Sequence, residues 1–211
     1  MTRLCLYILL PLFYLSFSAS GIASVDLSQF KQITNEQQLP KLLMSNLHRA
    51  SFVQTKKLAA LKRPIISSGE LVVNKDLGLL WYTKKPLNSI LKITKDGIYD
   101  IESNFNPIKQ TVVTNNQSFN EFLFAVLNLN WQFIQHEFRI YQSIQEPKEF
   151  LLLPVNSEMS KVFSNFRMMV GDQIEQIILW ENNSNKTTID FINLPTSALS
   201  KKELEYFVLD K

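Results

Sequence analysis

Residues that could carry out nucleophilic catalysis are scarce in this chain. The only cysteine is Cys5, the two histidines are His48 and His136, and no Gly-x-Ser-x-Gly turn is present. Nucleophilic catalysis needs a nucleophile, a base and a group that orients the base, and the sequence offers no such trio. Both histidines are therefore interpreted as structural residues, and no enzymatic activity is predicted.

Metal and phosphate sites are not predicted either. Two histidines without partner cysteines do not make a structural zinc site, and neither a His-Glu-x-x-His motif nor a calcium-loop spacing occurs. The five glycines are isolated, so the sequence has no glycine-rich loop that could hold a phosphate. We therefore expect no metal and no cofactor.

The chain is rich in large apolar side chains. It contains 15 phenylalanines and three tryptophans but only five glycines. Such side chains can fill a core or line an apolar cavity, and composition does not distinguish the two. A dry aromatic-lined pocket would gain about 0.8 kcal/mol for each methylene of a bound acyl chain. Acyl-chain binding is thus a chemistry that this composition permits without any catalytic group.

Residues 1–23 have the layout of a secretory signal peptide. Arg3 supplies the only charge, an apolar run extends from Leu4 to Phe17, and small residues follow. The run is too short to span a bilayer comfortably, which favours a cleaved leader over an uncleaved anchor. We expect cleavage near Ala23, with Ser20 as a second option, and hence a periplasmic protein.

Residues 24–211 are expected to form a single domain around one apolar core. Cys5 lies inside the leader, so the mature chain has neither a disulfide nor a cysteine for lipid attachment. Removing the leader lowers the formal net charge from +3 to +2, and basic residues alternate with acidic ones. This surface does not indicate nucleic-acid binding, and we expect a monomer.

Periodicity predicts a mainly β protein with helices, of the α+β class. An amphipathic helix is expected from Pro40 to Ala50, a second from Ser118, where Ser-Phe-Asn-Glu is a capping-box pattern, and a short third from Ser200. About ten antiparallel strands are expected, and no helix is expected between the strands of the first group, residues 51–102. Their predicted ranges are 51–60, 67–74, 79–84, 89–94, 97–102, 138–144, 149–155, 163–170, 174–181 and 187–193.

Alternation along the first strands predicts one apolar face. Leu71 and Val73 share a side of their strand, as do the pairs Leu79 and Trp81, and Leu91 and Ile93. A strongly twisted sheet of about ten strands tends to curl, and a helix with many phenylalanines is suited to cover its apolar side. Whether side chains or a ligand fill the enclosed space stays open at this stage.

Several short motifs occur in an order that resembles the periplasmic outer-membrane lipoprotein carrier (LolA-like) family, over nearly the whole mature chain. They include an F-x-Q strand, an S-x-G-x-L-x-V segment, a tryptophan followed by a proline, a D-G turn and late F-x-L-x-P and T-x-x-x-F strands. The residues that carry them are Phe52, Gln54, Ser68–Val73, Trp81, Pro86, Lys95–Gly97, Phe150, Leu152, Pro154, Thr188, Ile189 and Phe191.

The resemblance implies an incomplete antiparallel β-barrel covered by a helical lid, as in LolA- and LolB-like proteins. It also implies a carrier that holds the acyl chains of a lipoprotein or lipid for transfer toward the outer membrane. Its partners would be an inner-membrane transporter and an outer-membrane receptor. The residues expected to contact acyl chains are Phe52, Leu71, Val73, Trp81, Leu91, Ile93, Phe119, Phe122, Leu123 and Val126.

The chain departs from the family at two places. The family has an arginine and a proline ahead of the tryptophan, and that arginine holds the lid closed; this chain has Lys75 and Asp76 there. Lys75 is therefore the candidate for lid control, although a lysine offers a point charge instead of a rigid fork of donors. Late in the chain, Asn182–Asn185 replaces a turn with glycine and an acidic residue. The resemblance is that of a divergent member.

Two other functions are compatible with the same residues. The first is a periplasmic protein-interaction or sensor module that uses the half-barrel without lipid transport, for which a filled core and an exposed apolar patch would be the signature. The second is a hydrolase or transferase acting on envelope lipids, which would require an unexpected cluster of titratable groups around His48 or His136.

Overall fold

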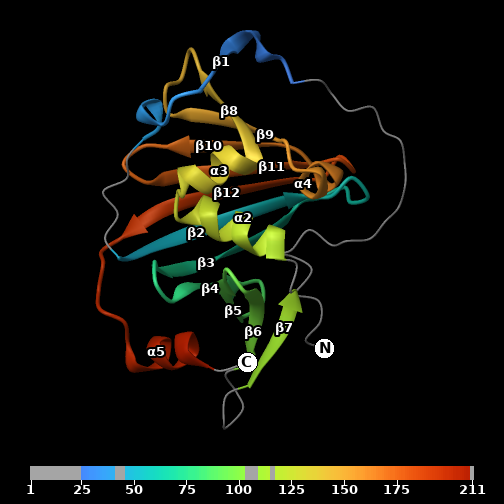
Figure 1. Ribbon diagram of the computed structural model, residues 1–211. Coiled ribbons are helices and arrows are strands. Elements are labelled where there is room, and N and C mark those ends of the chain that lie inside the picture. Colours follow the sequence, from blue (N-terminus) through green and yellow to red (C-terminus); the bar gives the residue numbers. More distant parts are fainter. Residues whose placement is uncertain (1–24, 41–45, 103–108, 115–116, 210–211) are drawn as a thin grey trace.

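The computed structural model describes residues 25–40, 46–102, 109–114 and 117–209, apart from the side chains of 109–110, 113–114 and 117–120. Twelve strands in the described residues form one antiparallel sheet (Figure 1). They are β1 (Phe30–Gln32), β2 (Leu47–Lys57), β3 (Ile65–Asn74), β4 (Gly78–Lys85), β5 (Ser89–Thr94), β6 (Gly97–Glu102), β7 (Lys109–Thr114), β8 (Phe138–Ser143), β9 (Glu149–Pro154), β10 (Phe163–Val170), β11 (Ile174–Glu181) and β12 (Lys186–Leu194).

The sheet consists of two meanders joined through a single strand pair. Strands β2 to β7 are neighbours in chain order, as are β8 to β12, and β12 pairs with β2 over the register Lys186↔Lys57 to Leu194↔Arg49. Strand β1 adds to β8, so β1 and β7 form the two edges of an unclosed sheet. The predicted incomplete antiparallel barrel is confirmed.

Local side-chain hydrogen bonds fix the tight turns of the first meander. The side chain of Asn74 accepts the backbone N–H groups of Asp76 and Leu77, and Gly78 takes φ = 118°, a conformation that suits glycine. In the β5–β6 turn, Thr94 Oγ1 accepts the N–H groups of Asp96 and Gly97. These two turns lie where the sequence predicts them.

Gly69 allows strands β3 and β4 to approach each other closely beside a bulge in their register. A side-chain carbon at Gly69 would collide with the backbone carbonyl of Tyr82 and lie 3.0 Å from the ring of Phe52. Only glycine fits this position without a backbone shift. The glycine of the S-x-G segment therefore has a packing role.

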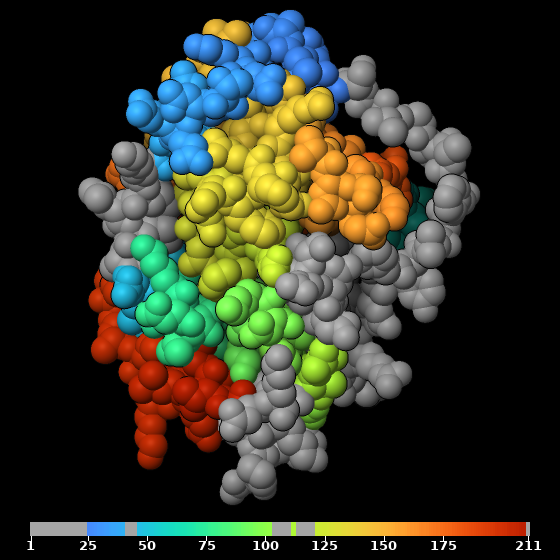
Figure 2. Space-filling model, viewed as in Figure 1, coloured from blue at the N-terminus to red at the C-terminus, as the bar shows by residue number. Residues whose placement is uncertain are grey.

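Helices cover the concave face of the sheet. They are α2 (Gln117–Leu127), α3 (Trp131–Glu137) and α4 (Ser157–Val162), and Figure 1 shows them crossing in front of the strands. In the space-filling view of the same side, α3 and α4 form continuous surface over the centre (Figure 2). Two short 3₁₀ turns, η1 (Leu27–Gln29) and η2 (Glu36–Gln38), flank β1.

The last helix, α5 (Lys201–Val208), covers part of the opposite, convex face. Its Tyr206 and Phe207 are buried against Val72, Leu80 and Ile101. The predicted capping box at Ser200 and Glu203 is present. Because both faces of β3 and β4 are covered, the runs Leu71–Val73 and Leu79–Trp81 are apolar without interruption.

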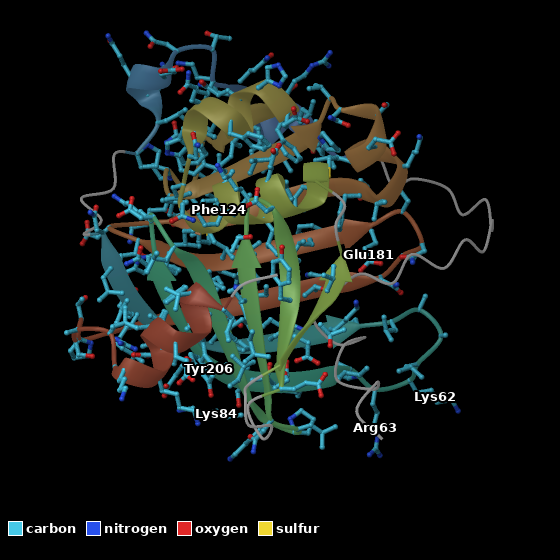
Figure 3. The ribbon with its side chains drawn as sticks, turned by 60° about the horizontal axis from the view of Figure 1, so that its bottom comes forward. Lys62, Arg63, Lys84, Phe124, Glu181 and Tyr206 are labelled. Carbon is cyan, nitrogen blue, oxygen red and sulfur yellow. The ribbon has the colours of Figure 1, made fainter. Side chains whose placement is uncertain are left out.

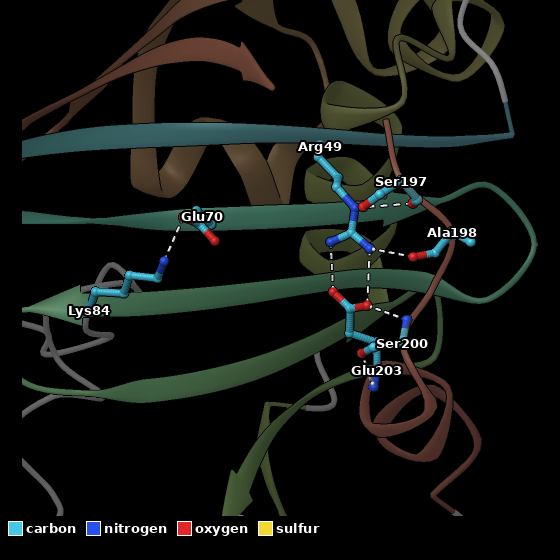
Figure 4. Close-up of polar contacts among 7 residues, drawn as sticks. All are labelled: Arg49, Glu70, Lys84, Ser197, Ala198, Ser200 and Glu203. Carbon is cyan, nitrogen blue, oxygen red and sulfur yellow. Dashed lines mark hydrogen bonds and ion pairs between the residues drawn. The ribbon is translucent and has the colours of Figure 1, made fainter. Parts of the chain in front are cut away.

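Arg49 ties α5 to the sheet from the convex side of β2. Its guanidinium donates to both carboxylate oxygens of Glu203, at 2.6 and 3.0 Å, and to the carbonyl oxygens of Ser197 and Ala198 (Figure 4). A planar two-point pair of this kind fixes direction as well as distance. The chain after β12 is thereby held against the outside of the sheet.

One sequence prediction about the elements is wrong, and four elements were not predicted. In the predicted helix from Pro40 to Ala50, residues 41–45 lie outside the described residues, but Leu47 to Ala50 belong to β2. Pairing of Leu47–Ala50 with β3, and of Arg49 and Ala50 also with β12, outweighs the helical spacing of the leucines. The edge strands β1 and β7 and the helices α3 and α4 were not predicted.

Candidate functional site

A small apolar pocket lies between helix α2 and the concave face of the sheet. Its volume is about 60 Å³, far below the roughly 300–1,000 Å³ of typical small-molecule sites. Most of the space inside the half-barrel is therefore occupied by side chains in this conformation. The pocket is lined by Gln54, Lys56, Trp81, Ile93, Phe122, Leu123, Val126, Leu127, Phe163, Phe166, Ile177, Leu179, Glu181, Thr187 and Ile189.

Helix α2 closes the pocket with its apolar side. Phe122, Val126 and Leu127 are buried, and Leu123 is half-buried. The ring of Phe122 lies 4.9 Å from that of Phe138 and 4.7 Å from that of Phe166, measured between centroids. The helix also packs on β5 and β6 of the first meander. It therefore bridges the two halves of the sheet.

The expected acyl-contact residues occupy three kinds of position. Trp81, Ile93, Phe122, Leu123 and Val126 line the pocket. Phe52, Leu71, Val73 and Leu91 belong to the same buried cluster without lining the pocket, and the rings of Phe52 and Trp81 lie 4.2 Å apart. The side chain of Phe119 lies outside the described residues. Alternation thus assigned the concave face of the first meander correctly.

Lys75, the candidate for lid control, lies in the exposed turn between β3 and β4. Its backbone N–H donates to the carbonyl of Asn46, 3.0 Å away. Burial, with the charge of Lys75 as a smaller cause, lowers the pKa of His48 to about 4. Lys75 does not line the pocket, and its part in lid control stays a prediction.

The far half of the pocket comes from the second meander, which the sequence interpretation did not assign to the site. Phe163 and Phe166 on β10, Ile177 and Leu179 on β11, and Ile189 on β12 all face α2. The signal for β11 and β12 was present in the period-two spacing of these residues. The bulge after Phe163 interrupts that spacing on β10, which places Phe163 and Phe166 on one face although they are three residues apart.

One end of the pocket is polar and charged. Lys56 Nζ on β2 and Glu181 Oε1 on β11 lie 3.9 Å apart, and the two side chains are only 4% and 5% exposed. Asn185 donates to the other oxygen of Glu181 at 3.0 Å. Burial lowers the pKa of Lys56, and the charge of Glu181 opposes that shift. In Figure 3, Glu181 lies on the same side of the molecule as Lys62 and Arg63 of the β2–β3 loop.

The two histidines, His48 and His136, lie in different environments. His48 lies at the other end of the concave strand from Lys56, in a site lined by Ala50, Leu127 and Phe191. His136 is exposed on α3, beside Glu137. Within the described residues, no three His, Cys, Asp or Glu side chains are grouped so that they could hold a metal ion.

The fold and the covered apolar face define the class of open antiparallel half-barrels with a helical lid. The family model described as outer membrane lipoprotein carrier protein LolA matches residues 44–206, and the chain belongs to this family. The family consists of periplasmic lipoprotein carriers and not of enzymes. A comparison with curated proteins gives no match. None of the helices in the described residues has the length and apolarity needed to cross a membrane.

Proposed function

We propose that this protein is a periplasmic carrier that holds the acyl chains of a lipoprotein or lipid under helix α2 and transfers them toward the outer membrane. The supporting observation is the apolar pocket between α2 and the concave face, with walls contributed by both meanders. The family to which the chain belongs gives this pocket its expected ligand. Residues 1–23, if they act as a leader, would deliver the protein to the periplasm.

Binding must be coupled to a movement of the lid. An acyl chain does not fit in about 60 Å³, so α2 has to move away from the sheet before a chain can enter. Each methylene that replaces a lid contact gains about 0.8 kcal/mol, so several methylenes can offset the apolar contacts that α2 gives up. The residues released would be Phe122, Leu123 and Val126 on the lid and Trp81 and Ile93 on the sheet.

Carrier function also needs partners that load and unload the protein. As for other members of the family, these would be a transporter in the inner membrane and a receptor in the outer membrane. Lys75, in the turn at the end of β3, is the proposed residue for lid control. Its exposed position would let a partner reach it without opening the core.

A substitution that fills the pocket tests this proposal. Leu123→Phe adds volume at a half-buried lid position that lines the pocket. We expect the free energy of unfolding to stay the same or rise, while the affinity for a fluorescent acyl probe falls about tenfold. Leu204→Phe, at an exposed position on α5, is the matched control and should leave both quantities unchanged. Equal probe affinity in the two variants would contradict the proposal.

The small volume of the pocket also favours a second candidate, a protein-interaction or sensor module built on the same half-barrel. A core that is already filled needs no ligand for stability. In that case the wild-type protein would take up no acyl probe at any concentration below the probe's own aggregation limit. The titration described above therefore decides between the two candidates.

A further inference from the structure

A group of buried polar side chains interrupts the apolar concave face. Gln54 and Lys56 follow Phe52 on the same side of β2, and Ser67 on β3 stands directly opposite Gln54. Thr83 follows Trp81 on the same side of β4. Gln54, Ser67 and Thr83 are 1%, 2% and 5% exposed. Gln54 and Lys56 line the pocket together with Glu181, whereas Ser67 and Thr83 lie beside them on the next strands without lining it.

Three donors in this region are buried without a hydrogen-bond partner. They are the hydroxyls of Ser67 and Thr83 and the indole N–H of Trp81. Leaving a buried donor unpaired is costly, and a natural fold retains few of them. The indole N–H can only donate, and each hydroxyl has a proton to give. A ligand that satisfies all three must therefore bring acceptor oxygens.

The charges at this end of the pocket cancel. Lys56 and Glu181 face each other at 3.9 Å, both almost completely buried. A carboxylate or phosphate that entered here would lose its hydration beside Glu181 and would meet no net positive charge. An uncharged acceptor, such as the carbonyl oxygen of an ester or amide, avoids that cost. The balanced charges and the three unpaired donors therefore both favour an uncharged ligand group with acceptor oxygens.

We infer that this polar end of the concave face binds the carbonyl oxygens of the ester or amide linkages that join acyl chains to the rest of the ligand. This inference rests on the proposed function, because it states how deep and in which direction the acyl chain of that function lies. The hydrocarbon would run under α2 among the phenylalanines. The linkage would accept hydrogen bonds from Ser67, Thr83 and Trp81.

Matched probes can separate the carbonyl from the hydrocarbon. 1-Palmitoylglycerol and 1-hexadecylglycerol have chains of the same length and the same head group, but only the first contains a carbonyl. Palmitate carries a carboxylate on the same chain. Each would be titrated against the purified protein in competition with a fluorescent acyl probe. We expect the ester to bind about tenfold more tightly than the ether, which corresponds to about one hydrogen bond, and palmitate to bind no better than the ether.

Two substitutions remove the proposed hydroxyl donors with little change in shape. In a Ser67→Ala, Thr83→Val double variant, the ester should lose its advantage while the affinity for the ether stays within about twofold. The thermal midpoint should stay the same or rise, because the deleted hydroxyls have no partner in the unliganded protein. Thr188→Val on β12 is the control, since Thr188 is half-buried on the opposite face from Thr187.

The outcomes distinguish this inference from the proposed function. If the protein binds none of the three compounds, the carrier proposal fails and this inference fails with it. If ester and ether bind equally, only this inference is overturned. It is also overturned if palmitate binds most tightly, or if the double variant loses ester and ether affinity together with its thermal stability.

Discussion

Arg49 near the start of β2 and Glu203 on α5 form a two-point ion pair that holds the last helix against the convex face of the sheet. The pair is part-buried, with side chains 15% and 14% exposed, and Glu203 Oε2 also accepts the backbone N–H of Ser200 at 2.7 Å. The hydrogen bond from Arg49 is the main cause that lowers the pKa of Glu203 from 4.5 to about 2. The Glu203 carboxylate thus takes part in both the ion pair with Arg49 and the capping box with Ser200.

This pair should contribute measurably to stability. Arg49→Met would leave the Glu203 carboxylate part-buried without its guanidinium, and we expect the free energy of unfolding to fall by about 1–2 kcal/mol. The control is Lys84→Met, because Lys84 pairs with Glu70 on the exposed surface of the same sheet (Figure 4). That change should cost less than about 0.5 kcal/mol. Urea titrations measure both, and equal losses would contradict the assignment.

We also expect the Glu203 carboxylate to make the stability of the fold depend on pH. Its pKa is depressed in the folded state, so its contribution to stability is complete above about pH 4.5 and is lost as the pH falls toward 2. Glu203→Gln should remove this part of the pH dependence. The measurement is the urea midpoint at pH 5, 4, 3 and 2 for both proteins. An unchanged slope in the variant would assign the effect to other carboxylates.

We expect His48 to make the stability of the fold depend on pH in a second, higher range. Burial, assisted by the charge of Lys75, lowers the pKa of His48 from 6.5 to about 4, so the folded protein binds this proton less readily than the unfolded chain. Stability should therefore decrease as the pH falls from about 6.5 to 4. His48→Gln should flatten the profile in that range. A profile that His48→Gln leaves unaltered would contradict the burial of the imidazole.

Because β3 and β4 approach each other closely at Gly69, we expect alanine to destabilise the protein more at Gly69 than at Gly171. Gly69→Ala forces a methyl group against the backbone carbonyl of Tyr82, and we expect a loss of about 2–3 kcal/mol. At Gly171 the nearest atom is the carboxylate of Glu175, a half-exposed side chain that can move away. Gly171→Ala should therefore cost less than about 1 kcal/mol. Thermal melts of both variants provide the comparison.

The regular hairpins are the part of the fold that the sequence specifies most directly. Ser89–Thr94, Gly97–Glu102, Phe163–Val170 and Ile174–Glu181 form strands with the predicted bounds, because alternating apolar residues and turn residues lie within the same short stretch. The start of β2 could not be predicted this way. Leu47 to Ala50 follow leucines at helical spacing, and pairing with β3, joined from Arg49 onward by pairing with β12, makes them a strand.

The candidate site was predicted for one half of the molecule. Alternation placed Trp81 and Ile93 on the concave face, and the phenylalanine-rich pattern of α2 predicted a helix that covers this face. Glu181 and Lys56 were missed, because each is a single charged residue at the end of a strand and nothing local indicates that they meet. Contacts between the two meanders depend on the β2–β12 pairing, which short-range patterns do not contain.

Native mass spectrometry with lipid extraction is the first measurement to make, because it shows whether acyl chains occupy the space under α2. The protein would be purified from the periplasm of its own host under gentle conditions. We expect a co-purifying acylated species, and we expect Leu123→Phe to reduce the bound fraction. A mass equal to that of the polypeptide alone, with no uptake of added lipoprotein or acyl probe, would contradict this expectation.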